Sequence, residues 1–486
     1  MNRILAVLMF AGVFVGCSNK PGNTSKEASS KQPNILVVLC DDLGYADVGF
    51  NGSPDIKTPN LDQLATNGMI FSSAYVTHPF CGPSRASIMT GRYAQNIGTP
   101  YNLYEEKGRT DDGVPVSETF ISNVLQDAGY YTAAVGKWHL GFSPRFQPNN
   151  RGFDEFYGFL SGGHDYFPER FSAKYQKQKE AGVDHIWEYL KPLVHDTTEV
   201  EEKEYITDAL SRETIRIINE TSERQKPFFI YLAYNAPHVP LQAKEEDMAQ
   251  FPEIEDKDRK TYAGMVYAVD RGVGDIINTL KENGQFENTL IVFLSDNGGN
   301  TDRGANNAPL QGRKGDAWEG GFRTPMFFHY PEKIKPNSTF DIPVSALDFY
   351  PTFAELAGAK IPKGKILDGT AIMDDILEGK EDLKDRPVYV CRYREDYVDA
   401  GTRMGDWKLT KMYNEDWKLF KINEDLGEAN DVSTEYPEKL QELKADMYEW
   451  TKGHVKPLWC YTPEDQLMWD KGVLPNYRKV FNITNN

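Results

Sequence analysis

The chain lacks an excess of basic residues. Its 486 residues carry 54 Lys and Arg against 72 Asp and Glu, which gives a formal charge of −18 at pH 7. Nonspecific nucleic-acid binding requires a basic face that releases phosphate counterions, so this charge excludes that class of function. An anionic ligand remains compatible with the sequence, because a few cations and a metal ion that converge in one cleft set the local field.

The chain also lacks an apolar run that could span a bilayer, which takes about 20 residues. The run Ile4–Val15 is shorter, follows a basic start and ends in Phe14-Val15-Gly16-Cys17, which resembles a bacterial lipobox. We therefore expect residues 1–16 to be a lipoprotein signal peptide, Cys17 to carry the lipid, and residues 17–32 to be a flexible tether. The alternative is an ordinary secretory signal with a chance Cys.

This leader predicts an exported protein that contacts the membrane through its N-terminal lipid only. Ser18-Asn19-Lys20 provides no acidic cluster after Cys17, so we expect the protein to face the periplasm rather than the cell surface.

Cysteine is scarce, with five residues in the chain. Cys40 ends an apolar strand and is expected to be a buried thiol. Cys391 and Cys460 could pair in an oxidising compartment, but the sequence does not establish that they are close in space. Cys81 lies in a distinctive motif that is treated below.

Continuous apolar runs alternate with helical patterns through the first three quarters of the chain. The runs, which suit strands buried on both faces of a largely parallel sheet, are Asn34–Cys40, Pro227–Tyr234 and Thr289–Ser295. The helical patterns are Pro59–Asn67, Ser117–Ala128, Glu204–Asn219 and Tyr262–Glu282. This alternation predicts an α/β fold with a large, mostly parallel sheet between layers of helices.

The pattern changes near residue 385. Residues 387–390, 405–409 and 416–420 are typical of short strands joined by polar turns, and a final helix is expected over Tyr436–Lys452. We therefore expect a catalytic domain over residues 33–385 and a C-terminal subdomain over residues 386–486, in which a helix packs on a small antiparallel sheet.

Oxygen-bearing side chains directly follow two of the apolar strands. Asp41 and Asp42 come after the first strand, and Asp296 and Asn297 come after Thr289–Ser295. Ligands of open α/β sheets bind at the carboxyl ends of the strands. Such hard oxygen donors suit Ca²⁺ or Mg²⁺ rather than zinc. Taken singly, either pair could instead be a turn former or a helix cap.

The segment Cys81-Gly82-Pro83-Ser84-Arg85 is the second chemical feature, and Thr90-Gly91-Arg92 follows it. Pro83 and Ser84 can open a helix whose N-terminus points backbone donors at Cys81, which favours an anion there. A thiol in that place could be a nucleophile of low pKa, but no His base is adjacent in sequence.

These residues resemble the signature of the type I sulfatases, the formylglycine-dependent branch of the alkaline phosphatase superfamily. The second signature of that family is similar to Gly129–His139, GYYTAAVGKWH, and the resemblance covers most of residues 33–455. Within the family, the chain resembles bacterial lipoprotein arylsulfatases and N-acetylgalactosamine-6-sulfatase-like enzymes. Gly82 replaces the more usual Ser, Thr or Ala.

The resemblance implies an alkaline phosphatase-like fold and removal of sulfate from a sulfated mono- or oligosaccharide. It implies that a maturase oxidises Cys81 to formylglycine, whose hydrated aldehyde is the nucleophile. The implied metal is Ca²⁺, with Mg²⁺ as the alternative, and its ligands would be Asp41, Asp42, Asp296, Asn297 and modified Cys81. Arg85 would hold the formylglycine hydroxyls, Lys137 and Lys314 would bind sulfate oxygens, His139 would help to expel sulfate, and His238 would protonate the leaving alcohol.

A Gly-rich, aromatic segment, Ser161–Phe167, is typical of a binding loop. We hypothesise that His164 and Asp165 hydrogen-bond sugar hydroxyls beside the sulfate; the alternative is a helix cap and a structural turn. Weaker candidates for sugar contacts are Arg109, Tyr101, Arg394 and Trp417.

Two other functions remain open at this point. A related hydrolase of phosphonate or phosphate esters would share the fold and sometimes the formylglycine. A glycan-binding lipoprotein whose Cys81 stays unmodified would bind sulfate without turnover.

Overall fold

The computed structural model describes residues 32–105, 109, 111–394 and 397–482. The expected signal peptide, the lipidation site Cys17 and the tether up to residue 31 lie outside the described residues. From Gln32 onward the chain forms one compact unit, and the domain boundary expected at residue 385 stays a prediction. Within the described part, no helix combines the length and the apolar character that crossing a bilayer requires.

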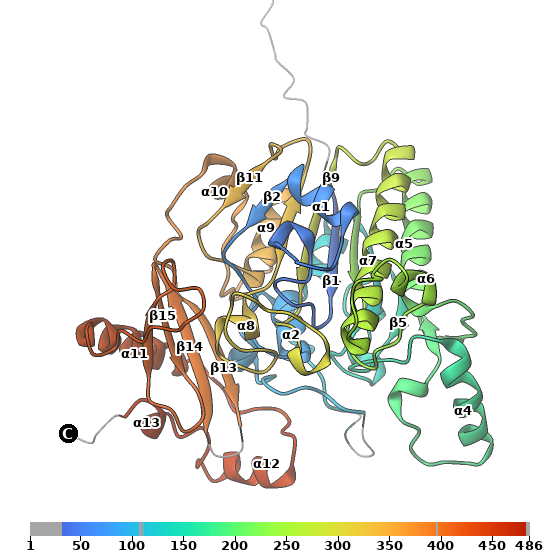
Figure 1. Ribbon diagram of the computed structural model, residues 1–486. Helices are drawn as coiled ribbons and strands as arrows, with labels where there is room; N and C mark the ends of the chain where they lie inside the picture. The colour runs from blue at the N-terminus through green and yellow to red at the C-terminus, as the bar shows by residue number, and fades with distance from the viewer. Residues whose placement is uncertain (1–31, 106–108, 110, 395–396, 483–486) are drawn as a thin grey trace, which may run out of the picture. The chain divides into compact units, whose positions relative to one another are not determined.

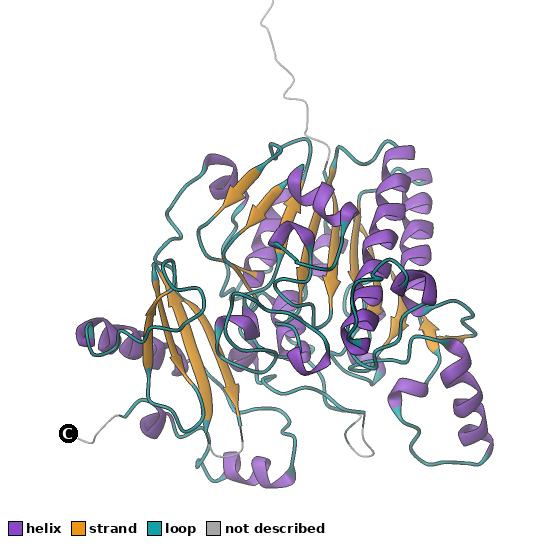
Figure 2. Cartoon of the chain, viewed as in Figure 1, coloured by secondary structure: helices purple, strands orange, loops and turns teal. Residues whose placement is uncertain are grey.

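The described residues contain a ten-stranded central sheet (Figures 1 and 2). In order across the sheet, its strands are β11 (Ser338–Phe340), β2 (Met69–Phe71), β10 (Met326–His329), β9 (Thr289–Ser295), β1 (Asn34–Cys40), β8 (Phe228–Ala233), β4 (Tyr131–Lys137), β5 (Glu155–Phe159), β6 (Leu193–His195) and β7 (Thr198–Val200). The strands from β9 to β5 run parallel, whereas β10, β6 and β7 pair antiparallel. The predicted mixed, mostly parallel sheet is confirmed.

Helices cover both faces of this sheet (Figure 2). The helices up to residue 378 are α1 (Pro59–Thr66), α2 (Cys81–Thr90), α3 (Ile121–Asp127), α4 (Pro168–Glu180), α5 (Ile206–Glu223), α6 (Glu245–Met248), α7 (Lys257–Glu282), α8 (Glu319–Phe322), α9 (Phe349–Leu356) and α10 (Met373–Glu378). Alternate residues of β1 enter two separate cores, one shared with α2, α3 and α9 and the other with α1, α5 and α7. Burial on both faces explains why β1 is apolar from Ile35 to Cys40.

Four strands form a second, antiparallel sheet in the C-terminal part that the structure describes. They are β13 (Val388–Tyr393), β14 (Val398–Met404), β15 (Trp407–Lys411) and β16 (Lys418–Lys421). Helix α11 (Pro437–Thr451) packs against β14 and β15, as expected. Three elements of this part were not predicted from the sequence: β14, α12 (Pro463–Asp470) and α13 (Tyr477–Val480). A short pair, β3 (Ala74–Tyr75) and β12 (Val344–Ser345), lies apart from both sheets.

The cysteines of the described residues are all buried free thiols: Cys40, Cys81, Cys391 and Cys460. Cys40 therefore has the position expected of it. Cys391 lies on β13 and Cys460 lies between α11 and α12, and the two are not joined in this structure.

Candidate active site

The site is built where four neighbouring parallel strands, β9, β1, β8 and β4, end at the same edge of the sheet. Asp296 and Asn297 follow β9, Asp41 and Asp42 follow β1, and His238 lies five residues after β8. Lys137 is the last residue of β4, and His139 comes two residues later. Parallel pairing therefore brings together side chains that are more than 250 residues apart in sequence.

The start of α2 places Cys81 against these strand ends. The helix begins at Cys81 itself rather than at Pro83, and Phe80 is its N-cap. The Cys81 thiol is 2% exposed and its Sγ lies 3.3 Å from Asp41 Oδ1. The convergence of strand ends and helix start that the sequence predicts is therefore present in the structure.

Two lysines contact the carboxylates from either side of Cys81. Lys137 Nζ lies 2.5 Å from Asp41 Oδ2, and Lys314 Nζ lies 2.6 Å from Asp42 Oδ1. Lys314 Nζ is also 3.3 Å from Cys81 Sγ. Burial lowers the pKa of Lys314, but the negative charge of Asp42 outweighs it and holds that pKa well above its usual range. Lys314 is therefore a permanent positive charge beside Cys81.

Arg85 reaches the opposite pair of strand ends from the next turn of α2. Its Nε and Nη2 lie 2.8 and 2.7 Å from Asp296 Oδ2, and its Nη1 donates to the carbonyl of Lys137 at 3.0 Å. Arg85 is fully buried. It therefore ties α2 to β9 and β4 and fixes the direction in which Cys81 points.

The oxygen atoms at the strand ends fit a hard divalent cation. Asn297 Nδ2 donates to Asp42 Oδ1 at 2.8 Å, whereas the buried Asn297 Oδ1 has no hydrogen-bond partner. Ligand atoms of Asp41, Asp42, Cys81 and His238 all lie within 4.8 Å of one another. An orphaned amide oxygen beside clustered carboxylates is the donor set that Ca²⁺ and Mg²⁺ use.

The electrostatics of the site shift the pKa values of Asp41 and Asp296 in opposite directions. Burial raises the pKa of Asp41, but Lys137, His238 and Arg85 reverse this and hold it below its usual range. Burial and the charge of Asp41 raise the pKa of Asp296 to about 6. Asp41 is therefore a fixed anion, while Asp296 titrates close to neutral pH.

Burial also shifts the pKa values of Cys81, His139 and His238. Burial and the charge of Asp41 raise the pKa of the Cys81 thiol to about 12, so an unmodified Cys81 is protonated at neutral pH. Burial lowers the pKa of His238 and, together with Lys137, the pKa of His139. Both imidazoles are therefore neutral at pH 7 in the unliganded protein.

Within the described part of the chain, each of the two histidines makes a hydrogen bond through one ring nitrogen only. His238 Nδ1 lies 2.7 Å from the carbonyl of Val239, and its Nε2 is 3.8 Å from Asp42 Oδ2. His139 Nε2 lies 3.0 Å from the carbonyl of Leu103, and its buried Nδ1 has no partner. Each free nitrogen can therefore accept a proton or bind a ligand.

Two residues of the site have left-handed backbone conformations that are uncommon outside glycine. Asp42 and His139 both have φ of 64°. Such conformations cost free energy and cluster at functional sites, where the surrounding structure holds them.

His164 and Asp165 do not reach this cluster. His164 is fully buried, and its two ring nitrogens lie 2.6 and 2.7 Å from the carbonyls of Asp165 and Lys191. Asp165 Oδ1 accepts from Gln242 Nε2 at 2.9 Å. These contacts match the structural alternative, because the polar loop packs inward and both side chains are occupied. Their role in sugar binding stays a prediction that the geometry does not favour.

The weaker candidates separate into two groups. Trp417 is buried and its Nε1 donates to the carbonyl of Val480, so it belongs to the C-terminal core. Arg109 lines a hollow beside Cys460. Tyr101 and Arg394 line a pocket of about 380 Å³, and Arg394 also lines the hollow over the site.

The hollow over Asp42, His238 and Lys314 has a volume of about 410 Å³ and contains residues that the sequence analysis did not select. Phe80 precedes Cys81, and Arg313 precedes Lys314. Arg392 comes from β13 of the C-terminal sheet. The alternation Arg392-Tyr393-Arg394 could have indicated two cations on one side of a strand, but sequence alone does not place β13 beside the site.

Comparison with known proteins is consistent with this geometry. The family model described as Sulfatase matches residues 33–359, and the model described as N-sulphoglucosamine sulphohydrolase, C-terminal, matches residues 314–453. The uncharacterized sulfatase YdeN of Escherichia coli (strain K12) is 36% identical over 74% of this chain and 68% of its own length. N-acetylgalactosamine-6-sulfatase of Mus musculus is 32% identical over 89% of this chain and 80% of its own length.

A solved structure, Ps i-CgsB in complex with k-i-k-neocarrahexaose, is 51% identical with a TM-score of 0.90 and covers 93% of this chain and 100% of its own. The matched Sulfatase model, over residues 33–359, spans both the strand ends that hold the site and the segment that carries Cys81. The chain therefore belongs to the sulfatase family, whose members are sulfuric ester hydrolases with an alkaline phosphatase-like fold.

Proposed function

We propose that this sulfatase removes a sulfate ester from a sulfated oligosaccharide, with Cys81 converted to formylglycine and Ca²⁺ held by Asp41, Asp42, Asp296 and Asn297. The observation that carries the proposal is the position of Cys81, whose Sγ lies 3.3 Å from both Asp41 Oδ1 and Lys314 Nζ. A group at that point can touch the metal ligands and a sulfate-binding cation at once.

The state of the thiol supports chemical conversion of Cys81. Burial holds its pKa at about 12, so it is a poor nucleophile at neutral pH, where a catalytic thiol needs a depressed pKa. Formylglycine at position 81 would supply a hydrated aldehyde whose hydroxyl serves as the nucleophile towards sulfur. Asp296 would accept a proton from that hydroxyl. Arg85 would hold Asp296 in place through its bonds of 2.8 and 2.7 Å to Oδ2.

Lys137 and Lys314 would bind the sulfate oxygens. Both are anchored to carboxylates at 2.5 and 2.6 Å, so their charges are held in place before the substrate arrives. The metal, when bound, adds positive charge beside the same oxygens. Charges that are fixed in advance stabilise the transition state without a cost of reorganisation.

His238 is proposed to protonate the leaving alcohol. His238 lines the hollow over the site, and its pKa is lowered by burial. A sulfate ester bound beside Nε2 brings a negative charge, which favours the protonated ring. His139, whose Nδ1 has no partner, would take the proton when sulfate leaves the modified residue 81.

The proposed substrate class rests on the relatives. Ps i-CgsB binds an oligosaccharide in its solved complex, and the mouse relative is named for a sulfated amino sugar. We further propose that a maturase installs the formylglycine, that the protein is exported, and that lipid on Cys17 anchors it to a bacterial membrane, facing the periplasm. Radiolabelled palmitate incorporated by the wild type and not by Cys17→Ala would support the anchor.

Mass spectrometry of the tryptic peptide Thr58–Arg85, from protein made in its native host, tests the nucleophile. We expect the peptide mass of formylglycine in place of cysteine, and turnover that Cys81→Ala abolishes. An unmodified thiol in a protein that binds sulfated glycans without turnover would instead identify a binding protein. Rates on matched aryl sulfate and aryl phosphate separate a sulfatase from a phosphate-ester hydrolase.

A further inference from the structure

A second pocket adjoins the hollow over the active site. Its volume is about 380 Å³, and it is lined mainly by tyrosines and by the arginine pair Arg392 and Arg394. The same two arginines line the hollow that contains His238 and Lys314. The two cavities therefore share a cationic wall, and a ligand that occupies one can extend into the other.

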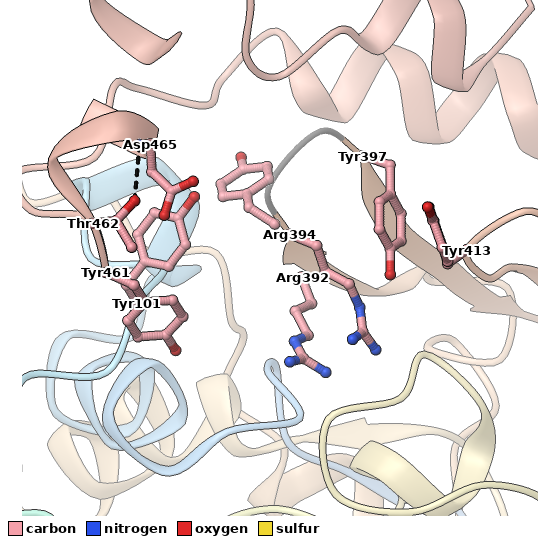
Figure 3. Close-up of a pocket in the computed structure, with 9 residues that line it drawn as sticks. Tyr101, Arg392, Arg394, Tyr397, Tyr413, Tyr461, Thr462 and Asp465 are labelled. Atoms are coloured by element: carbon pink, nitrogen blue, oxygen red, sulfur yellow. Dashed lines mark hydrogen bonds between the residues drawn. The ribbon is translucent and has the colours of Figure 1, made fainter. Parts of the chain in front are cut away.

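Arg392 lies on β13 and Arg394 directly follows its last residue, and the two side chains point in the same direction (Figure 3). Arg392 Nη1 donates to the carbonyl of Gly315 at 2.7 Å, and its guanidinium lies 4.4 Å from the ring centre of Phe80. Phe80 precedes Cys81, and Gly315 follows Lys314. Arg392 is therefore next to the catalytic segments on two sides.

Arg392 has no carboxylate partner among the described residues, and its only hydrogen bond to the chain there is to the Gly315 carbonyl. Burial and the neighbouring charge of Arg394 lower the pKa of Arg392. Arg394 is different, because its Nε lies 2.5 Å from Asp399 Oδ2, a buried carboxylate. Arg394 Nη2 also lies 4.0 Å from Asp316 Oδ1. Arg392 is therefore the one of the two cations without a carboxylate at salt-bridge distance among the described residues, and an anionic ligand would supply that partner.

Aromatic rings flank the arginine pair. Tyr397 and Tyr413 stack with ring centres 3.8 Å apart on one side, and Tyr101 and Tyr461 lie on the other, with ring centres 4.9 Å apart (Figure 3). Ligand sites commonly combine aromatic walls with a few charged groups that fix orientation. Rings on both sides of a cationic centre suit a sugar that carries an oxyanion.

We propose that Arg392 and Arg394, with the flanking tyrosines, form a subsite for a second oxyanion on the sugar next to the one that loses its sulfate. This inference rests on the proposed function, because it assigns specificity to the same cleft. The oxyanion is a sulfate ester or a carboxylate, since both match the planar fork of a guanidinium. The enzyme would thus select oligosaccharides with acidic groups on neighbouring residues.

The test compares three versions of one disaccharide: one with a single scissile sulfate, one with a second sulfate on the neighbouring sugar, and one with a carboxylate there. In the wild type we expect kcat/KM to be about 10- to 100-fold higher for the two dianionic versions, as expected for a charge-assisted hydrogen bond. Preference for one dianionic version over the other identifies the oxyanion. Arg392→Gln and Arg394→Gln should each bring the ratio of dianionic to monoanionic kcat/KM towards one.

Arg224→Gln is the matched control, because it removes one positive charge from an exposed side chain that pairs with Glu220. It should leave the ratio unchanged. A wild-type ratio of one, or a ratio that neither arginine variant alters, would overturn the subsite. Failure of the formylglycine-loaded wild type to hydrolyse any of the three would instead overturn the proposed function. Arg392→Gln keeps the experiment decisive if Arg394→Gln fails to fold, because Arg392 pairs with no carboxylate in the described structure.

Discussion

Replacing Lys408 with Met should destabilise the protein strongly and in a pH-dependent way. Lys408 lies on β15 and is fully buried; its Nζ is 3.2 Å from Glu319 Oε1 and 3.2 Å from Glu428 Oε1. It also donates to the carbonyl of Ala317 at 2.9 Å. Glu319 begins α8, so Lys408 joins the C-terminal sheet to the segment that follows Lys314.

The loss in the free energy of unfolding arises because two carboxyl groups stay buried without the charge of Lys408. Removal of one partner of a buried ion pair costs about 3–5 kcal/mol. Arg323, 3.1 Å from Glu319 Oε2, remains to compensate that carboxylate, whereas Glu428 loses its only salt-bridge partner among the described residues. The free energy of unfolding should therefore fall by about 3–5 kcal/mol at pH 8.

The pH dependence comes from Glu428. Burial raises its pKa from 4.5 to about 7, although Lys408 opposes this. The folded state therefore holds a proton that the unfolded state releases between these values, and the stability contributed by this group falls as the pH rises from 4.5 to 7, by about 3 kcal/mol in total. Without Lys408 the pKa of Glu428 rises further. The loss in Lys408→Met should thus be smaller at pH 6, where Glu428 is already protonated, than at pH 8.

Urea unfolding followed by circular dichroism at pH 6 and pH 8 measures both effects. Lys452→Met is the control, because its exposed pair with Glu449 should contribute less than about 1 kcal/mol. Adding Glu428→Gln to Lys408→Met should restore part of the stability at pH 8. A loss below about 1 kcal/mol at pH 8, or a larger loss at pH 6, would refute the argument.

Three further predictions concern the active site and its support. His238→Ala should lower kcat about 10²- to 10⁴-fold on a sugar sulfate and less on a 4-nitrophenyl sulfate, because the phenolate needs little protonation; equal losses in steady-state assays would contradict proton donation. Gly136→Ala should lower the free energy of unfolding by at least about 3 kcal/mol, because φ of Gly136 is +106° and a Cβ there would lie 2.0 Å from the carbonyl oxygen of Ala233. Gly129 has φ of +93° but open space around it, so Gly129→Ala should lower it by about 1–2 kcal/mol. Similar losses in thermal unfolding would show that the contact with Ala233 is unimportant. Chelation should lower Tm and added Ca²⁺ should restore it. At a 100-fold excess of Ca²⁺ over Kd, the free energy of unfolding should rise by about 3 kcal/mol. Elemental analysis that finds no bound metal, or a Tm shift with Ca²⁺ that is unaltered in Asp42→Asn, would exclude the proposed ligands.

The parts of the fold that could be predicted are those in which a continuous run of apolar residues forms one buried strand. The strands Asn34–Cys40 and Thr289–Ser295 have the predicted bounds because continuous apolar runs fill them, Ile35–Cys40 in the first and Leu290–Leu294 in the second. The carboxylates that follow them were predicted to meet because parallel strands end at one edge. Strand β14, with the sequence VDAGTRM, was missed because it has no apolar run, and the burial of Asp399, Thr402 and Arg403 comes from tertiary packing that the local sequence does not show.

The same physical reason limits what sequence says about the site. The loop around His164 is polar and rich in glycine, which is typical of solvent-facing binding loops, yet His164 is buried against two backbone carbonyls. Conversely, Arg392 lies beside Phe80 and Gly315 although more than 75 residues separate it from either. The local sequence shows which residues are polar. The direction in which a side chain points depends on which distant segment of the chain packs next to it.

The local charge at the strand ends explains how an acidic protein can bind an anion. Asp41, Asp42 and Asp296 face Arg85, Lys137 and Lys314 at distances of 2.5–2.8 Å, so the formal charges of this set cancel when all six are ionised. Addition of a divalent cation would give the set a net charge of about plus two. This local positive charge would attract a sulfate ester, which the protein's net charge of −18 would otherwise repel. Because the carboxylates hold the lysines as well as the proposed metal, removing one carboxylate should displace a sulfate-binding cation and a metal ligand together. Metal affinity and sulfate affinity are therefore coupled through the same three side chains.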